Sequence, residues 1–344
     1  MIRKNKKTII TSFFLLSSFV LLALFSKDIQ DRAHLIFNSF EENDFGYEYD
    51  FAVLNKSFKR DLERSVILYK SFEKHFLNFE NTPFYIVIPS RDWKLFLDRF
   101  RDLKSRGEIK MIPKFMTEQE VFQRCGDEDV SDHGNVAQQV VKLCFGSTRV
   151  AKNYLQIDSD NYFLKDFDSK ILFKNGKPIT MAYELSKSVI EEGKNMNLPC
   201  AYDPILRNYE RMSADDMHMF KKNFFGNRVK KRYGFVFSSY LFNSDSLFRM
   251  KKFIEKKGGY KISHLIRLIP YEMQWYGEYV LQQENFIRGI PIFSLISSPD
   301  ECHSEIPSDN SYGICFQSVI YTKTPVTDNP KLIYKRPPHC DIGR

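Results

Sequence analysis

The stretch YLQIDSDNYFL, residues 154–164, places two aspartates, Asp158 and Asp160, between two short apolar runs. The run at 154–157 has the composition of a buried strand, so the carboxylates follow at the carboxyl end of that strand. In open α/β sheets, ligands bind beyond the carboxyl ends of the strands. Carboxylate oxygens are hard ligands of the kind that Mg²⁺ and Mn²⁺ prefer. The stretch therefore predicts a metal site at a strand end, with an ordinary polar turn as the alternative.

Two other aspartate pairs share this spacing but not this setting. Asp127 and Asp129 lie in the charged segment CGDEDVSDHG, and Asp166 and Asp168 lie in LKDFDSK, which has the composition of a surface turn. Only the pair at 158 and 160 directly follows an apolar strand near the middle of the chain. Its context, rather than the D-x-D spacing itself, makes it the functional candidate.

The rest of the chain alternates between strand-like and helix-like segments. Strands are expected at 49–55, 84–89, 108–113, 154–157, 179–184, 234–243 and 290–296, and helices at 60–76, 92–106, 134–145 and 273–283. Repeated strand-helix-strand units imply a mostly parallel sheet with helices on both faces. The sequence thus predicts an α/β fold in a single doubly wound domain.

The overall composition is that of a folded protein, with 344 residues, 43% hydrophobic content and 27% charged residues. That length suffices for one large α/β domain or for two smaller ones. The formal net charge is +8, and half of it comes from Arg3, Lys4, Lys6 and Lys7. The remaining surplus is small, so nucleic-acid binding is not expected.

The N-terminal segment predicts a membrane anchor. Residues 8–26 form a run of 19 without a charge, long enough as a helix to cover about 28 Å of a hydrocarbon core of about 30 Å. An uncleaved anchor is favoured over a signal peptide, because the apolar run is long and Ala23-Leu24-Phe25 is not a small-x-small cleavage site. The basic residues before the run place the N-terminus in the cytosol, which is type II topology.

This topology gives five expected regions. They are a cytosolic basic tail at 1–7, a transmembrane signal anchor at 8–26, a stem at 27–46, the folded domain at 47–322 and a proline-containing tail at 323–344. In a eukaryote, we expect a single-pass membrane protein whose domain faces a Golgi-like lumen. In a bacterium, the expected location is the inner membrane with the domain facing the cytosol.

The six cysteines are widely spaced and include no CxxC pair, so zinc spacing is absent. In an oxidising compartment some of them could pair, and buried free thiols are the equal alternative. Asn55-Lys56-Ser57 is the only glycosylation sequon.

Three segments resemble a known group of enzymes. Residues 134–167, GNVAQQVVKLCFGSTRVAKNYLQIDSDNYFLKDF, resemble the central segment of glycosyltransferases with the GT-A fold. The resemblance is greatest to a little-characterised family in which a Gln-Gln-x-x-Lys helix precedes the strand that carries D-S-D. Residues 49–72 are similar to that family's first strand, loop and helix. FVFSSYLFN (235–243) and WYGEYVL (275–281) are similar to its acceptor-side region. Together the matches cover most of residues 47–300.

The resemblance implies a donor site. Asp158 and Asp160 would hold Mn²⁺ or Mg²⁺ together with the diphosphate or ribose of a nucleotide sugar. The loop after the first strand would form part of the nucleotide pocket, through Asn55, Lys56, Ser57 and Asp61, which makes glycosylation of Asn55 unexpected.

The helix before the D-S-D strand would add Gln139 and Lys142 to the donor site. These two residues are expected on the polar side of that helix, and a solvated helix face is the alternative for both.

The resemblance also implies later site residues. Enzymes with this fold often use a late histidine as a further metal ligand, and His303 is better placed for this than His339, although a lone histidine is more often structural. An inverting transferase needs a carboxylate base to take the proton of the acceptor hydroxyl, and Glu278 is the candidate. Glu272, on another side of the same expected helix, is the reserve.

The expected function is therefore transfer of a sugar from a nucleoside diphosphate sugar to a hydroxyl of a glycan, lipid or protein. One alternative is a metal-dependent nucleotidyl or phosphoryl transferase, against which stands the absence of a G-x-x-x-x-G-K-[ST] phosphate loop. The other is a membrane-anchored protein that binds sugar or nucleotide without turnover.

Overall fold

A computed structural model describes residues 46–130, 134–163, 165–184, 224–226, 233–235, 239–284, 287–289, 293–296 and 313–316. The chain divides into two units, Met1–Gly46 and Tyr47–Arg344, and the account below concerns the second. The expected anchor, stem and C-terminal tail lie outside the described residues, apart from Gly46. Within the described part of the chain, no helix combines the length and apolarity needed to cross a membrane.

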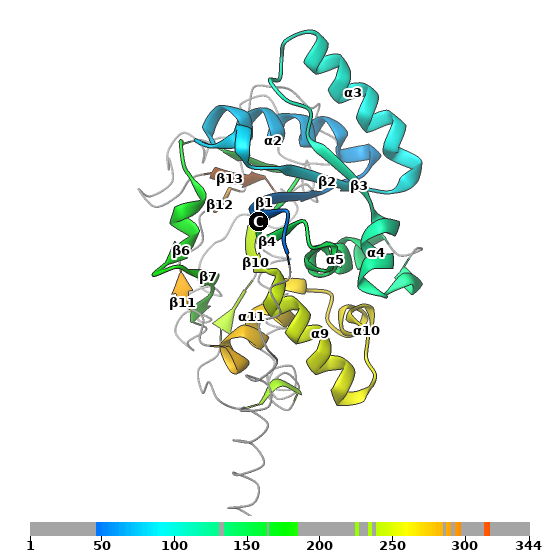
Figure 1. Ribbon diagram of the computed structural model, residues 1–344, viewed down its shortest axis with the longest axis vertical. Helices are drawn as coiled ribbons and strands as arrows, with labels where there is room; N and C mark the ends of the chain where they lie inside the picture. Colours follow the sequence, from blue (N-terminus) through cyan, green and yellow to red (C-terminus); the bar gives the residue numbers. More distant parts are fainter. Residues whose placement is uncertain are drawn as a thin grey trace, which may run out of the picture. The chain divides into compact units, whose positions relative to one another are not determined.

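A five-stranded sheet with the order β10-β4-β1-β2-β3 forms the centre of this unit (Figure 1). Its strands are β1 (Tyr49–Lys56), β2 (Phe84–Ile88), β3 (Lys114–Thr117), β4 (Ala151–Asp158) and β10 (Ser239–Asn243). The first four are parallel to their neighbours, and only β10 runs antiparallel, against β4. The expected α/β fold with a mostly parallel sheet is confirmed.

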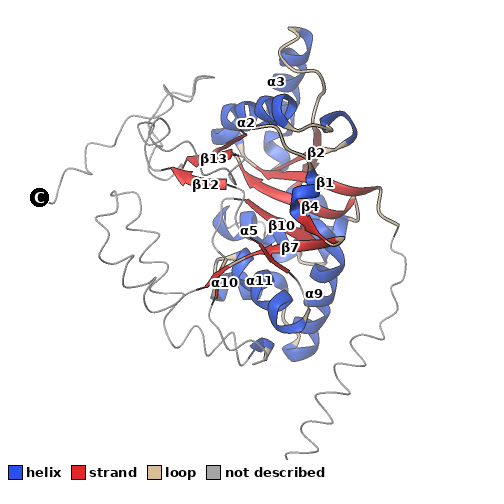
Figure 2. Ribbon diagram, turned by 90° about the vertical axis from the view of Figure 1, so that its left-hand side faces the viewer, coloured by secondary structure: helices blue, strands red, loops and turns tan. Residues whose placement is uncertain are grey.

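Helices cover both faces of the sheet (Figures 1 and 2). On one face lie α2 (Leu62–His75) and α3 (Trp93–Ser105). On the other side lie α4 (Glu118–Cys125), α5 (Gly134–Cys144), α9 (Ser244–Gly258), α10 (Ile262–Leu268) and α11 (Glu272–Gln283). Alternate residues of each strand point to opposite faces of the sheet, and apolar side chains lie on both faces.

Aromatic side chains fill both layers between helices and sheet. On the α2 side, the Phe72 ring lies 5.0 Å from that of Phe84 on β2. On the α5 side, Phe145 lies 5.0 Å from Tyr154 on β4. All four side chains are buried. Burial of such large apolar areas is the main favourable term that holds the layers together.

Shorter elements surround the central sheet. The strands are β5 (Asn161–Phe163), β6 (Phe173–Lys174), β7 (Lys177–Met181), β8 (Tyr183–Glu184), β9 (Tyr233–Gly234), β11 (Ile287–Gly289), β12 (Phe293–Ile296) and β13 (Gly313–Phe316). The 3₁₀ turns are η1 (Lys59–Asp61), η2 (Phe79–Asn81), η3 (Ser90–Asp92), η4 (Glu128–Val130), η5 (Phe145–Thr148) and η6 (Ser169–Leu172). β5 directly follows the D-S-D turn and pairs with β13 from near the end of the chain.

Three expected strands are wrong in detail. The segment 108–113 is a loop, and the third parallel strand begins only at Lys114. The reason is that the Glu73 carboxylate accepts hydrogen bonds from the backbone amides of Lys110 and Met111, at 2.8 and 2.7 Å. These amides are therefore not available to a neighbouring strand. The expected strand at 179–184 is divided between β7 and β8. The expected strand at 234–243 contains the end of β9 and all of β10, and residues 236–238 lie outside the described residues.

Three helices, α4, α9 and α10, were not expected from the sequence. The first begins at a capping box in which Thr117 and Glu120 bond to each other's backbone amides. The second begins where the Asn243 side chain accepts from Ser246 N at 2.9 Å. Both are ordinary N-terminal helix signals, and the first is visible in the sequence as T-E-Q-E.

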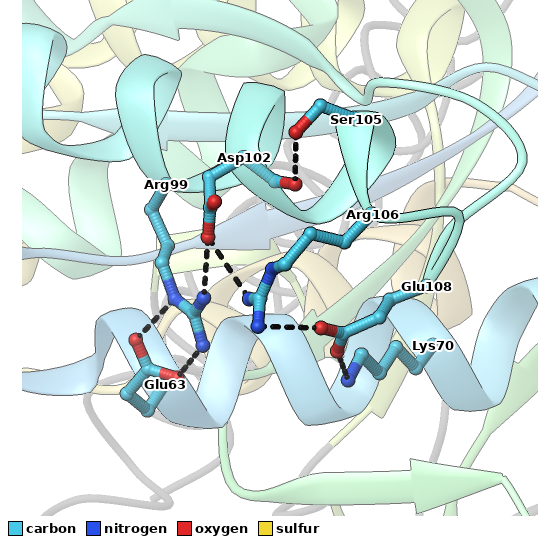
Figure 3. Close-up of polar contacts among 7 residues, drawn as sticks. All are labelled: Glu63, Lys70, Arg99, Asp102, Ser105, Arg106 and Glu108. Atoms are coloured by element: carbon cyan, nitrogen blue, oxygen red, sulfur yellow. Dashed lines mark hydrogen bonds and ion pairs between the residues drawn. The ribbon is translucent and has the colours of Figure 1, made fainter.

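An ion-pair network joins α2 to α3 and to the loop after α3 (Figure 3). Arg99 makes two 2.8 Å contacts with Glu63 on α2 and a third contact with Asp102. Arg106 then links Asp102 to Glu108, which also pairs with Lys70 on α2 at 2.8 Å. Exposed pairs contribute little individually, so the main effect of the network is to fix the position of the loop that starts at residue 106.

A disulfide joins Cys125, at the end of α4, to Cys144, at the end of α5. The sequence left open whether any of the cysteines pair, and these two do. Both are buried, and the bond fixes α4 against the helix that leads into β4.

Replacement of both cysteines by alanine is expected to lower the free energy of unfolding by about 3 kcal/mol, because the bond closes a loop of 19 residues. Urea unfolding with and without dithiothreitol measures the change. The reductant should destabilise the parent protein and leave the Cys125→Ala/Cys144→Ala variant unchanged. Equal stability of parent and variant without reductant would contradict the bond.

Candidate functional site

The candidate site lies where β1 and β4 end side by side. In the register of these parallel strands, Lys56 is opposite Asp158, and a serine follows each of them in the chain. Because side chains alternate along a strand, the polar residues here separate into two groups, one on each face of the sheet.

The group on the α2 face is a buried network of an amide and three hydroxyls. Asn55 Nδ2 donates to Ile157 O at 3.0 Å and lies 3.2 Å from Ser159 Oγ. Ser65 Oγ, on α2, lies 2.7 Å from Ser57 Oγ and 2.9 Å from Asn55 Oδ1. Every member is buried. The network ties the D-S-D turn to the loop after β1 and to α2.

This burial changes what Asn55 and Ser57 can do. Both side chains are 0% exposed, so in this fold they hold the turn in place and do not face a ligand. A glycan on Asn55 is likewise incompatible with the fold, because its amide nitrogen is enclosed and already donates to the backbone. Sequence reasoning also expected an unmodified asparagine, but on the ground of a nucleotide pocket.

The group on the α5 face is a buried ion triad. Lys142 Nζ lies 2.8 Å from Asp158 Oδ1 and 2.9 Å from Glu272 Oε1. The Lys142 side chain is 1% exposed and that of Glu272 2%, whereas that of Asp158 is 26% exposed. A solvated helix face is therefore wrong for Lys142, which reaches the strand-end aspartate from α5.

A second contact fixes the same carboxylate oxygen. Gln156 Nε2, two residues earlier on β4, donates to Asp158 Oδ1 at 2.9 Å. Both contacts use Oδ1, and no hydrogen bond or ion pair among the described residues involves Oδ2. The aspartate is thus held by one oxygen, Oδ1.

The charge state of the triad follows from burial and attraction. Burial lowers the pKa of Lys142, but attraction and hydrogen bonds from Asp158 and Glu272 outweigh it and raise that pKa above its ordinary value. Burial raises the pKa of Glu272, and the attraction of Lys142 opposes this only in part. Lys142 therefore carries a positive charge at neutral pH. It pairs with two carboxylates, that of the partly exposed Asp158 and that of the buried Glu272.

The loop after β1 is held by further polar contacts. Lys56 Nζ pairs with Glu118 on α4 at 2.8 Å and donates to Ser57 O at 2.7 Å, and burial lowers the pKa of Lys56. Asp61 pairs with Arg64 on α2 at 2.7 Å. The side chains of Lys56 and Asp61 are thus occupied by residues of neighbouring helices.

Asp160 lies on the turn after β4 and is half-buried. Asn161 Nδ2 donates to Asp158 O at 2.9 Å and lies 3.4 Å from Asp160 Oδ1. No group of three or more His, Cys, Asp or Glu side chains suited to a metal occurs among the described residues, and His303 lies outside them.

The two carboxylates of α11 occupy different surroundings. Glu278 is buried, and Gln282 Nε2 donates to its Oε1 at 3.3 Å. Glu272, the reserve base of the sequence analysis, instead belongs to the Lys142 triad. The backbone amide of Glu272 donates to Gln139 Oε1 on α5 at 3.4 Å, so Gln139 is connected to Asp158 through Glu272 and Lys142.

Sequence reasoning missed the roles of Glu272, Gln156, Ser65 and Glu118. One signal was available, since Lys142 is the only charged residue between 134 and 145 and its neighbours VVKLCF are apolar. A helix end that is apolar all round is buried, so its single charge needs a buried partner. No comparable signal in the sequence identifies Glu272 as that partner.

Replacement of Lys142 by methionine is expected to destabilise the fold by about 3–5 kcal/mol near neutral pH, because it leaves buried carboxylates without their cation. Without Lys142 the pKa of Glu272 rises further. A carboxyl group with a raised pKa in the fold contributes stability that is present below its ordinary value of 4.5 and lost as pH rises. The deficit should therefore be larger at about pH 8 than at about pH 5, as measured by urea unfolding.

The matched control is Lys142→Met/Glu272→Gln, in which the pH-dependent part of the deficit should disappear. A Lys142→Met deficit that is the same at both pH values would contradict the triad.

Comparisons with known proteins found one matching family and several similar solved structures. Residues 52–189 match a family of unknown function, DUF6492. No curated protein matches the chain. Among solved structures, the WbbM bifunctional glycosyltransferase in its apo form is similar at 12% identity and a TM-score of 0.42, over 78% of this chain and 46% of that one. Apo mouse xyloside xylosyltransferase 1 is similar at 10% identity and a TM-score of 0.41, over 78% of this chain and 98% of that one. The chain thus spans less than half the length of the WbbM chain.

Proposed function

We propose that this protein is a metal-dependent glycosyltransferase that moves a sugar from a nucleoside diphosphate sugar to a hydroxyl of a glycan, lipid or protein. The observation that carries the proposal is the aspartate pair at the carboxyl end of β4, in which the buried Lys142 holds Asp158 by one oxygen. The resemblance of residues 134–167 to glycosyltransferases of GT-A fold supplies the chemical class. The expected type II membrane anchor at residues 8–26 remains part of the proposal.

The residues at the turn fit a hard divalent cation. Asp158 Oδ2 and the Asp160 carboxylate supply oxygen ligands, and Mg²⁺ and Mn²⁺ bind through one or two carboxylates together with phosphate oxygens. When bound, such an ion neutralises the charge that develops on a departing diphosphate. The chain's own contribution is to fix Asp158 through Lys142 and Gln156 and to fix the turn through the Asn55 network. His303 remains the candidate for an additional ligand.

Two rival functions use the same residues. A nucleotidyl or phosphoryl transferase would release nucleoside monophosphate and sugar 1-phosphate from a nucleotide sugar, whereas a glycosyltransferase slowly releases free sugar and nucleoside diphosphate. A binding protein would release neither. Analysis of the products formed from a panel of nucleotide sugars in the presence of Mn²⁺ separates all three.

Nucleoside diphosphates are expected to stabilise the protein in the presence of Mn²⁺ and not in its absence. At a concentration of 100 times the dissociation constant, the gain is about 2.7 kcal/mol, and a thermal shift of the full chain measures it. The Asp158→Asn/Asp160→Asn variant should lose the response, because the carboxylates that would hold the ion are gone.

The control for this experiment has the same spacing elsewhere. Asp166→Asn/Asp168→Asn alters a pair in which Asp166 lies beside His75 and Asp168 accepts from Lys170 N. It should keep the full nucleotide response. Loss of the response in the control, or its survival in the Asp158 and Asp160 variant, would overturn the assignment of the donor site.

Glu278 is the proposed general base, on the premise that the enzyme inverts configuration. Glu278→Gln should lower the rate of transfer by about 10²–10⁴-fold, the usual contribution of a positioned base. It should leave the thermal shift with nucleoside diphosphate and Mn²⁺ intact, because the proposed ion ligands Asp158 and Asp160 are on β4 and the turn after it. A Glu278→Gln variant with an unchanged rate of transfer would remove this residue from the mechanism.

A further inference from the structure

The first aspartate of the D-S-D turn already has a cation in contact with it. The ammonium of Lys142, on α5, lies 2.8 Å from Asp158 Oδ1, and the Lys142 side chain is only 1% exposed. Contacts between charged groups are stronger in such a water-poor interior than at the surface. Asp158 therefore meets a further cation with part of its negative charge already compensated.

The other charges near the strand ends do not provide this compensation. Among the ion pairs of the described residues, only the one with Lys142 involves Asp158. The two ion pairs at the end of β1 and in the loop after it are each neutral, Lys56 with Glu118 and Asp61 with Arg64. The charge that Asp158 experiences is therefore set mainly by Lys142 and by the second carboxylate that Lys142 contacts.

That second carboxylate, Glu272 on α11, weakens the effect of Lys142 without removing it. Lys142 Nζ lies 2.9 Å from Glu272 Oε1. Glu272 reaches Asp158 only through the ammonium, so the ammonium is the nearer charge, and the Coulomb energy falls with distance. Removal of Glu272 alone would leave the whole ammonium charge facing Asp158, whereas removal of both groups would leave Asp158 without compensation.

A divalent cation is sensitive to such a neighbour. Mg²⁺ and Mn²⁺ bind through one or two carboxylates and usually depend on substrate phosphates for further ligands. A fixed positive charge beside one of the carboxylates opposes the binding of the ion. A diphosphate supplies both oxygen ligands and negative charge, so it restores what the lysine takes away.

We propose that Lys142 is a built-in counterion of Asp158, which keeps the affinity of Asp158 and Asp160 for a divalent cation low until a nucleoside diphosphate binds with the ion. The inference rests on the proposed function, because it takes this aspartate pair as the metal-binding part of the donor site. Lys142 acts through Asp158, as a positioning residue, and the ion and the diphosphate raise each other's affinity. The ion therefore arrives and leaves with the nucleotide.

The test measures binding of Mn²⁺ alone to the full chain, from the loss of the electron paramagnetic resonance signal of the free ion. Lys142→Gln/Glu272→Gln removes one positive and one negative charge and keeps a polar side chain at both positions. Its affinity for Mn²⁺ should be about tenfold higher or more, because a contacting opposite charge changes the charge equilibrium of a carboxylate by about 10–10³-fold.

The single variant Glu272→Gln should change the affinity in the opposite direction. It leaves the full charge of Lys142 on Asp158, so Mn²⁺ should bind about threefold more weakly or less tightly still. It also retains a paired lysine, so the test does not depend on whether the double variant folds.

Two further variants are controls. Asp158→Asn, added to Lys142→Gln/Glu272→Gln, should abolish the gained binding if the ion is at the D-S-D turn. Glu63→Gln/Arg99→Gln removes an ion pair between α2 and α3 with contacts of 2.8 Å (Figure 3) and should leave the affinity unchanged. Circular dichroism verifies the fold of each variant.

The outcomes separate this inference from the proposed function. A purely structural role for Lys142 predicts unchanged or weaker Mn²⁺ binding in the double variant, and that result would overturn the proposal. So would a gain that survives Asp158→Asn, or an unchanged or higher affinity in Glu272→Gln. If the parent chain shows no thermal shift with Mn²⁺ and any of UDP, GDP, ADP or CDP, the proposed function fails as well. A normal shift in the parent together with no gain in the double variant overturns the inference alone.

Discussion

A lysine buried between two carboxylates sets the conditions that the rest of the structure has to meet. An unpaired ammonium in an apolar interior is very costly, so Lys142 on α5 requires anionic partners within contact. One partner comes from the end of β4 and the other from the start of α11, which lie more than 100 residues apart in the chain. Helices α5 and α11 and the carboxyl end of β4 therefore have to meet for any of them to be correctly placed.

The same ion triad fixes the orientation of the carboxylate at the end of β4. An aspartate on an exposed turn has several rotamers, whereas Asp158 is held at Oδ1 by both Lys142 and Gln156. On the other face of the sheet, the hydroxyl network of Asn55, Ser65 and Ser159 fixes the backbone of the turn. Each face contributes a separate constraint, and the geometry presented to a ligand results from both.

The parallel core was predictable from the sequence because its strands are short apolar runs and its helices have apolar faces at regular spacing. The apolar runs before residue 56 and before Asp158 end where the strands end, so the carboxylate pair was correctly placed at a strand terminus. The same reasoning gave a wrong prediction for the segment 108–113. Its apolar residues resemble a strand, but a carboxylate distant in sequence, that of Glu73, binds its amides. The local sequence pattern could not identify the partner of Lys142 either, because Glu272 lies 130 residues later in the chain.

The short strand after the D-S-D turn has a consequence for the order in which the protein is completed during synthesis. β5 begins at Asn161, next to Asp160, and its partner β13 begins only at Gly313. The ribosome therefore releases the first four parallel strands long before it releases the segment that pairs beside the carboxylates. The four parallel strands can form early from contacts that are close in sequence, whereas the flank of the D-S-D turn remains unpaired until a segment about 150 residues later emerges (313 − 161 = 152). A nascent chain therefore has a folded core before it has a finished site.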